Sequence, residues 1–189
     1  IAAETGAKLD QVTLSFGGAL TRLETRLYGE GDKIEALING AYLLDGKRHT
    51  DMTSHIDLKS PNCTIRQSVK GVVTDKSRGV FQGKFHVHRE AQHTDAEMRH
   101  DALMLSDTSE IRAKPELEIY ADDVICSHGS TTGAIDEDAL YYLRSRGVPK
   151  AAATDLLTLA FLAESVEEID DSAIAETIVS RLESWLARR

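Results

Sequence analysis

The pattern of the chain changes across Lys114-Pro-Glu-Leu-Glu-Ile-Tyr-Ala-Asp-Asp-Val-Ile-Cys-Ser-His-Gly-Ser-Thr-Thr-Gly133. Leu117 and Ile119 alternate with polar neighbours, and this period of two predicts a strand with one buried face. Gly129 to Gly133 is a run of small residues, which predicts a turn. Strand-like runs precede this segment and helical patterns follow it. We therefore expect a mainly β chain with a C-terminal α part.

Short runs with strand patterning fill the chain up to about Val124. They are Val12–Phe16, Ile34–Ile38, Ala41–Leu44, His55–Leu58, Cys63–Val69, Val80–His88, Ala102–Leu105 and Leu117–Tyr120. No helical pattern interrupts them, which excludes a parallel sheet covered by crossover helices. A sandwich, a barrel and a solenoid remain. Asn39-Gly40 and Asp45-Gly46 suit tight hairpins and support a sandwich, while no repeat of fixed length is visible to indicate a solenoid.

Three helices are predicted after Gly133. Asp136 is a good N-cap and Gly147 a C-terminal stop, so the first helix runs from about Asp136 to Arg146. Pro149 suits the first turn of a second helix, which reaches about Ile169 and has an apolar stripe of Ala152, Leu156, Leu159, Ala160 and Ala163. Asp170-Asp171-Ser172 begins a third, with the stripe Ile174, Ile178, Leu182, Trp185 and Leu186. We interpret these stripes mainly as packing surfaces, with a partner interface that includes Trp185 as the alternative.

Composition and charge narrow the range of partners. The 189 residues carry a formal net charge of -9, which argues against nucleic acid or an anionic membrane as the main partner, because both require a basic face. No apolar run approaches the roughly 20 residues needed to span a bilayer, and no signal segment is visible. We expect protein partners and a cytoplasmic location. Cys63 and Cys126 alone cannot supply the four thiolates of an ordinary iron-sulfur cluster.

Cys126 and His128 form the first candidate site. They are two residues apart, so on an extended backbone both project to one face and can share a metal ion or an electrophile. A buried thiol and a core histidine are the competing interpretation. Val124 on the same face and Ile125 on the other predict a strand that is enclosed on both sides or covered by a partner. Asp122 and Asp123 point to opposite faces of such a strand and suit turn capping better than paired acid-base catalysis.

The histidines suggest a second type of site. His86 and His88 lie on the polar side of the predicted strand at 80–88, and a His-x-His pair can open a zinc site if His93 and His100 in the following loop complete it. Solvated surface histidines are the favoured interpretation. A stand-alone metal-binding module that uses these four histidines remains an alternative function.

An enzyme is the other alternative. A β-helix hydrolase or lyase acting on polysaccharide requires carboxylates and an arginine on one solvent face. Only Asp57, Asp95 and Glu97 near Arg66 and Arg99 hint at such a group, and the acids are otherwise dispersed. No glycine-rich phosphate loop is present in the sequence, so nucleotide hydrolysis would belong to another subunit.

Several motifs carry a resemblance to a known family. They are the run that begins at Lys114, Cys126-Ser-His-Gly, Asp136-Glu-Asp, Tyr141-Tyr-Leu-Arg-Ser-Arg-Gly-Val-Pro, Ser77-Arg-Gly-Val-Phe-Gln-Gly-Lys and Ala91-Gln-His-Thr-Asp. Together they resemble the C-terminal core of the SufB/SufD family, the scaffold subunits of the SUF iron-sulfur cluster assembly system. Cys-Ser-His-Gly favours the SufD branch, although Ser130 stands where that branch usually has Ala. The resemblance is specific in the second half of the chain and rests on pattern in the first.

The resemblance implies a fold and a role. Residues 1–133 would form a right-handed parallel β-helix, truncated at its N-terminus, and residues 134–189 a small helical domain. Such a C-terminal fragment of SufD would be a non-catalytic scaffold, with no cofactor in the isolated chain and an iron-sulfur cluster present only transiently in the complex. An open first rung near Val12, Leu14 and Phe16 would let the fragment self-associate as a homodimer.

The resemblance also implies partner surfaces. The β-helix edge and the strand of Cys126 and His128 would pair with SufB, and both side chains would be metal ligands shared with that partner chain. The SufC ATPase would dock on the helical region 136–169. Its candidate contacts are Asp136, Tyr141, Tyr142, Arg144 and Arg146.

Overall fold

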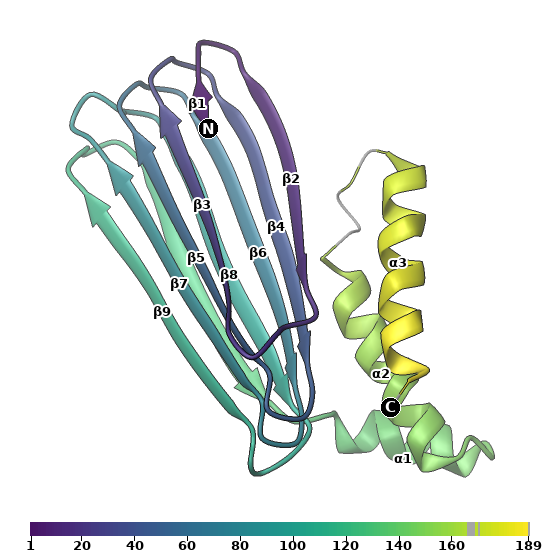
Figure 1. Cartoon of the computed structure of the whole chain (residues 1–189). Helices are drawn as coiled ribbons and strands as arrows, with labels where there is room; N and C mark the ends of the chain where they lie inside the picture. The colour runs from purple at the N-terminus through teal and green to yellow at the C-terminus, as the bar shows by residue number, and fades with distance from the viewer. Residues whose placement is uncertain (166–168, 170, 189) are drawn as a thin grey trace.

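A computed structural model describes residues 1–165, 169 and 171–188 of the protein. Within these residues the strands form two parallel sheets and alternate between them along the chain (Figure 1). Sheet A has the order β1 (Ala2–Ala3), β3 (Thr21–Gly29), β5 (His49–Leu58), β7 (Arg78–Val87) and β9 (Glu110–Ile119). Sheet B has the order β10 (Ile125–Gly133), β8 (Asp95–Met104), β6 (Thr64–Val73), β4 (Glu35–Leu44) and β2 (Lys8–Ser15). The chain is therefore a parallel β-solenoid, as the resemblance implied.

The sandwich that the turn signals supported is wrong. Asn39-Gly40 lies inside β4, where the Asn39 side chain accepts a hydrogen bond from the Ser68 N–H of β6 at 3.1 Å. Asp45-Gly46 does turn the chain, with Gly46 at φ 60°, but it leads to the opposite sheet. No fixed repeat was visible because the rungs differ in length. Asn39 and Ser68 are 29 residues apart, whereas the neighbouring pair Lys70 and Asp101 are 31 apart.

Two strand segments could not be predicted from the sequence and were identified only in the structure. β3 was not foreseen, and the turn predicted over Gly129 to Gly133 is wrong, because those residues complete β10. They stay extended because each pairs in register with β8, from Ile125 opposite Asp95 to Gly133 opposite Leu103. Ladder pairing outweighs the low strand propensity of small residues.

The interior between the sheets holds the first hydrophobic core, which includes Phe81, Phe85 and Met98. A polar pair lies within it. The Tyr42 hydroxyl is 2.9 Å from His100 Nε2, and the His100 ring stacks on Phe81 with 4.8 Å between centroids. The Tyr42 ring fits because residues 71 and 79 are both glycine, and a Cβ at either would collide with it.

The helices are α1 (Glu137–Ser145), α2 (Lys150–Ala163) and α3 (Ser172–Leu186). The predicted caps are confirmed: the Asp136 carboxylate accepts hydrogen bonds from the N–H groups of Asp138 and Ala139, and Gly147 has a φ of 90°. α2 ends before the predicted Ile169, and the predicted helical residues 166–168 and the predicted start at Asp170 lie outside the described residues.

The buried faces of the helices were predicted unequally. In α3, Ile178, Leu182, Trp185 and Leu186 are buried as expected, and Ile174 is exposed. In α2 the predicted stripe is wrong, because the buried residues are Ala153, Thr158 and Leu162, while Ala152, Leu156 and Ala160 are exposed. α2 is apolar on nearly every side, so its sequence does not define which face packs.

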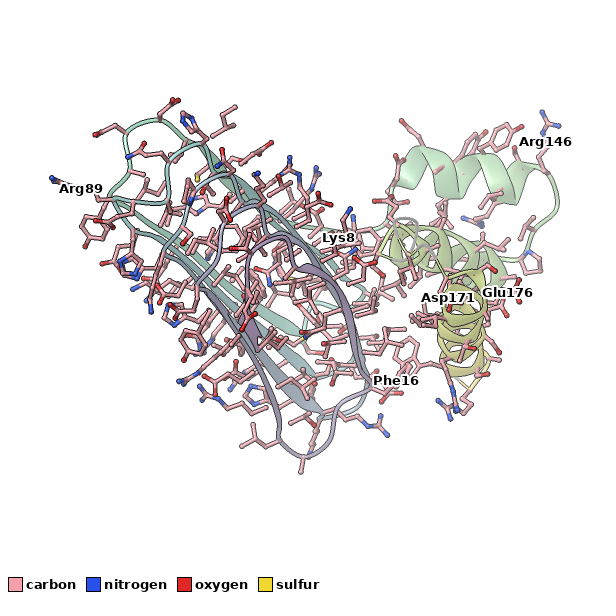
Figure 2. The ribbon with its side chains drawn as sticks, turned by 90° about the horizontal axis from the view of Figure 1, so that it is seen from above. Lys8, Phe16, Arg89, Arg146, Asp171 and Glu176 are labelled. Carbon is pink, nitrogen blue, oxygen red and sulfur yellow. The ribbon has the colours of Figure 1, made fainter. Side chains whose placement is uncertain are left out.

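The helices pack against the outer face of sheet B and form a second core with it (Figure 1). Ala41, Leu43 and Val72 of the sheet lie in this core with Leu162, Leu182 and Trp185. Val12, Leu14 and Phe16 pack against the same core, and Figure 2 shows Phe16 on the side of the solenoid that faces the helices. These three residues are therefore not an open first-rung surface. None of the described helices is long and apolar enough to cross a membrane.

Candidate functional site

The terminal rung, β9 with β10, is the candidate site. Each strand has a hydrogen-bonded neighbour on one side only, β7 for β9 and β8 for β10. A free strand edge presents unpaired N–H and C=O groups and can accept a further strand. The solenoid therefore ends in two edges that a partner can extend.

The two edges are not equivalent. The N–H groups of Glu110 and Tyr120 donate to Ser77 O and Val87 O on the β7 side, so those of the odd residues of β9 point to the free edge. Pro115 occupies one of these odd positions and has no N–H to offer. In β10 the Ile125 N–H donates to Thr94 O, so the even residues present their N–H groups at the free edge without a proline. β10 is therefore the edge better suited to pairing.

Cys126 and His128 continue an interior column of the solenoid. They stand opposite Ala96 and Met98 of β8, whose side chains are buried between the sheets. No further rung of the described structure covers them, so Cys126 is half-buried and His128 is exposed. The prediction of an enclosed strand is wrong for this chain, since Ile125 on the opposite face is 73% exposed. The core-histidine interpretation is wrong because His128 itself is exposed.

The Cys126 thiol sits against the first core, and burial raises its pKa. It is consequently a protonated thiol at neutral pH and a weak nucleophile in the isolated chain. A metal ion would have to displace its proton before binding. The imidazole of His128 is exposed to solvent.

The face of β9 that continues the interior of the solenoid is apolar. Ile111, Leu117 and Ile119 stand opposite the buried Gly79, Phe85 and Val87 of β7. All three side chains remain partly or fully accessible. The end of the solenoid therefore exposes side chains of the kind that are buried in the preceding rungs, with Cys126 and His128 on its β10 side. These apolar residues were not predicted as part of the site, because only the rung register reveals that they share one end.

The two aspartates before β10 lie in the connection from β9 and are both exposed. Asp123 is 2.9 Å from His93 Nδ1, and its N–H donates to the Gln92 side chain. Asp123 is therefore held by contacts with the loop before β8.

The candidate ATPase contacts lie on α1 and at its two caps, Asp136 and Arg146. Tyr141 is 73% and Tyr142 56% exposed, Arg144 is exposed, and the Arg146 guanidinium lies over the Tyr142 ring at 5.0 Å. Figure 2 shows Arg146 at the tip of the helices, pointing away from the strands. The exposed Asp136 also serves as the N-cap of α1. Exposed tyrosines beside arginines are typical of binding hot spots.

The predicted four-histidine site is not assembled. His86 and His88 are close, with 4.1 Å between ring centroids, and both are 2.8 Å from the same Asp57 oxygen. His93 pairs with Asp123 in the loop before β8. His100 is in the interior, where burial lowers its pKa to about 4.

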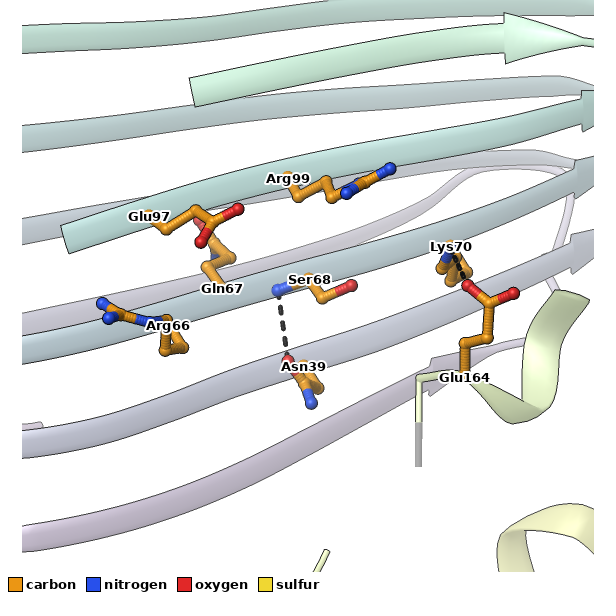
Figure 3. Close-up of a pocket in the computed structure, with 8 residues that line it drawn as sticks. All are labelled: Asn39, Arg66, Gln67, Ser68, Lys70, Glu97, Arg99 and Glu164. Carbon is orange, nitrogen blue, oxygen red and sulfur yellow. Dashed lines mark hydrogen bonds and ion pairs between the residues drawn. The ribbon is translucent and has the colours of Figure 1, made fainter. Parts of the chain in front are cut away.

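The acids and arginines proposed for a polysaccharide enzyme do not converge. Arg66, Glu97 and Arg99 line a groove of about 340 Å³ on sheet B beside α2 (Figure 3). The arginines are paired there, Arg66 with Asp95 and Arg99 with Asp101, each at 2.7 Å. Asp57 is on sheet A, bound to two histidines. This arrangement offers no pair of free carboxylates.

The same groove shows how the helices are fixed to the solenoid. Lys70 of β6 is buried, and its Nζ lies 2.7 Å from Glu164 at the end of α2 (Figure 3). The same Nζ lies 3.2 Å from Asp101 of β8. Its ammonium group also lies 4.6 Å from the centre of the Phe161 ring. Burial alone would raise the pKa of Asp101, but hydrogen bonds from Thr131, Arg99 and Lys70 outweigh it and hold that pKa below its usual value.

Comparison with known proteins gives a consistent result. The family described as "SUF system FeS cluster assembly, SufBD core domain" matches residues 1–161. The iron-sulfur cluster assembly protein SufD of Escherichia coli (strain K12) is 36% identical over 167 residues, which cover 88% of this chain and 40% of that protein. SufD of Bacillus subtilis (strain 168) and protein ABCI7, chloroplastic, of Arabidopsis thaliana are each 30% identical, covering 90% and 92% of this chain. The chain spans 38% and 37% of those two proteins.

Proposed function

The chain belongs to the SufBD core family of the SUF iron-sulfur cluster assembly system, and we propose on that basis that it acts as a SufD-type scaffold subunit rather than as an enzyme. The cluster is then the product that the complex assembles, not a cofactor resident in this chain. We also propose a cytoplasmic location, to which the two free cysteines are suited.

The single observation that carries the proposal is the open terminal rung. It combines an unblocked strand edge in β10 with half-buried apolar side chains in β9. We propose that a strand of SufB continues the β10 ladder, because main-chain hydrogen bonds and the burial of an apolar end act together in such strand addition. The added rung would enclose Cys126 and His128 at the boundary between the two chains.

The chemistry of the two side chains fits such a boundary. A thiolate is a soft ligand for iron, and a neutral imidazole can replace a thiolate in some clusters. We propose that His128 is the principal iron ligand from this chain, because its ring is exposed and forms no hydrogen bond within the described residues. Cys126, whose pKa is raised by burial, would serve as a secondary ligand. The remaining ligands would come from SufB.

The helical region supports the second half of the proposal, docking of the SufC ATPase. Tyr141, Tyr142 and Arg144 of α1 and Arg146 at its C-cap are exposed, and Leu140 is the only buried residue of α1. A helix that buries so little within its own chain has surface available for a partner.

A proline at the free edge tests the strand pairing directly. By the alternation described for β10, the Thr132 N–H points to the free edge, so Thr132→Pro preserves the ladder with β8 but removes an edge donor and blocks close approach. In the full-length protein we expect at least a tenfold loss of SufB recovered by affinity co-purification. Thr132→Ala is the matched control and should keep full recovery. Normal recovery of SufB by the proline variant would refute pairing through β10.

A further inference from the structure

A cluster of potential metal ligands lies on the outer face of sheet A, away from the terminal rung. It consists of His55 and Asp57 of β5 and His86 of β7. One ligand atom from each lies within 4.8 Å of the others. Donor atoms bound to one zinc ion lie about 3–4 Å apart, so small side-chain rotations would suffice for them to share an ion.

The solenoid itself creates this cluster. His55 and Asp57 are two residues apart on one strand and therefore project to the same face, as do His86 and His88 at the end of β7. The register places His86 directly opposite Asp57. His86 Nδ1 and His88 Nε2 each lie 2.8 Å from Asp57 Oδ1, so the carboxylate stands between two imidazoles.

The third imidazole provides an independent observation. The Nε2 atom of His55 is buried and has no hydrogen-bond partner in the described structure. A buried polar atom without a partner costs free energy on the order of 1–3 kcal/mol. His55 thus carries an unsatisfied ring nitrogen within a cluster that also contains a carboxylate and a second imidazole, and a bound metal ion would satisfy such a group.

The surrounding charges leave the cluster available to a cation. Lys59 is paired with Glu30, Lys84 with Glu118, and Arg26 with Glu24. Tyr28 stands opposite Asp57 in the ladder, and the edge of Tyr120 contacts His86 with 5.6 Å between centroids. The neighbouring cations are therefore neutralised by their own partners, and Asp57 supplies the negative charge of the cluster.

We propose that His55, Asp57 and His86 bind one divalent transition-metal ion, with His88 in reach as a fourth ligand. Two imidazoles and one carboxylate suit zinc or ferrous iron, whereas magnesium and calcium prefer all-oxygen ligands. His86 and His88 are partly exposed, with 24% and 33% of their side chains accessible, so an ion can enter from solvent. The site is on the opposite sheet from Cys126 and His128 and does not depend on the proposed scaffold role.

Cobalt(II) binding tests the proposal. The chain should be prepared without a polyhistidine tag and freed of metal with a chelator, and its visible spectrum followed during titration with cobalt chloride. We expect one equivalent of cobalt to bind per chain, and zinc to displace it. His55→Ala, Asp57→Asn and His86→Ala should each weaken binding at least tenfold while the far-ultraviolet circular dichroism stays unchanged.

A surface histidine outside both candidate sites serves as the control. His93→Ala removes an imidazole that is also paired with an aspartate. It should change neither the affinity nor the stoichiometry. No saturable binding, or an equal loss of affinity in the His93 variant, would overturn the proposal.

Discussion

His128 stands opposite Met98 in the β10–β8 ladder, yet Met98 is completely buried and His128 is exposed. The two side chains occupy the same column of the solenoid, one rung apart. Met98 is covered by the rung of β10, whereas no strand within the described residues covers His128. The same column position is thus a packing site in one rung and an accessible functional group in the next.

This relationship predicts that substitutions of Met98 and His128 change the stability of the protein by very different amounts. Met98→Ala removes a fully buried side chain and should lower the free energy of unfolding by about 2–5 kcal/mol. His128→Ala removes an exposed side chain and should change it by less than about 0.5 kcal/mol. Urea unfolding of the isolated chain measures both. A large loss in the His128 variant would mean that its ring packs in solution.

His100 should make the protein sensitive to mild acid. Burial lowers its pKa from 6.5 to about 4, so the folded protein resists a proton that the unfolded chain accepts. The stabilisation is complete above pH 6.5 and is lost as the pH falls from 6.5 toward 4, by on the order of 1.4 kcal/mol per pH unit. His100→Gln, which retains hydrogen-bonding groups, should show a flatter profile across this window in urea unfolding. Parallel profiles would contradict the assignment.

Asp101 should act in a lower pH window. Its pKa is held below the usual 3.8, because hydrogen bonds from Thr131, Arg99 and Lys70 outweigh the opposing effect of burial. Its contribution is therefore present above pH 3.8 and is lost below it. Asp101→Asn should lower stability by about 2–3 kcal/mol near neutral pH and much less in strong acid. A destabilisation that does not vary with pH would show that the charge of Asp101 is unimportant.

Substitutions on α1 test the ATPase surface better than deletion of the helices. Removal of residues 136–189 would uncover Ala41, Leu43 and Val72, so lost binding could simply reflect misfolding. Tyr141→Ala combined with Arg146→Ala leaves that core intact and should reduce SufC binding at least tenfold by calorimetry with the full-length protein. Tyr28→Ala, an exposed tyrosine of β3, is the control. Unchanged binding by the α1 variant would move the docking site elsewhere.

Local features such as helix caps could be predicted from the sequence. Asp136 and Gly147 bound the first helix as expected, because capping depends on the side chain and on φ at that residue. Asn39-Gly40 indicated a hairpin that does not form, because ladder pairing on both sides of β4 keeps these residues extended. The small residues of β10 indicated a turn, and pairing with β8 keeps them extended in the same way. The motif resemblance, not the periodicity, identified the solenoid.

The site was only half predictable. The i, i+2 spacing put Cys126 and His128 on one face, but their exposure depends on where the last rung ends. The His86-x-His88 pair was visible, yet its acidic neighbour Asp57 and the adjacent His55 lie one rung earlier. Rungs of unequal length hide such neighbours in the sequence, and only the register brings them together.

The role of the terminal rung is tested most directly by the iron and acid-labile sulfide content of the SUF complex that contains full-length His128→Ala. We expect the variant to co-purify with SufB and SufC at normal abundance, while its cluster content falls at least tenfold. His93→Ala, a surface histidine outside the terminal rung, should assemble clusters normally. Normal cluster content in the His128 variant, at unchanged complex abundance, would contradict the role proposed for the terminal rung.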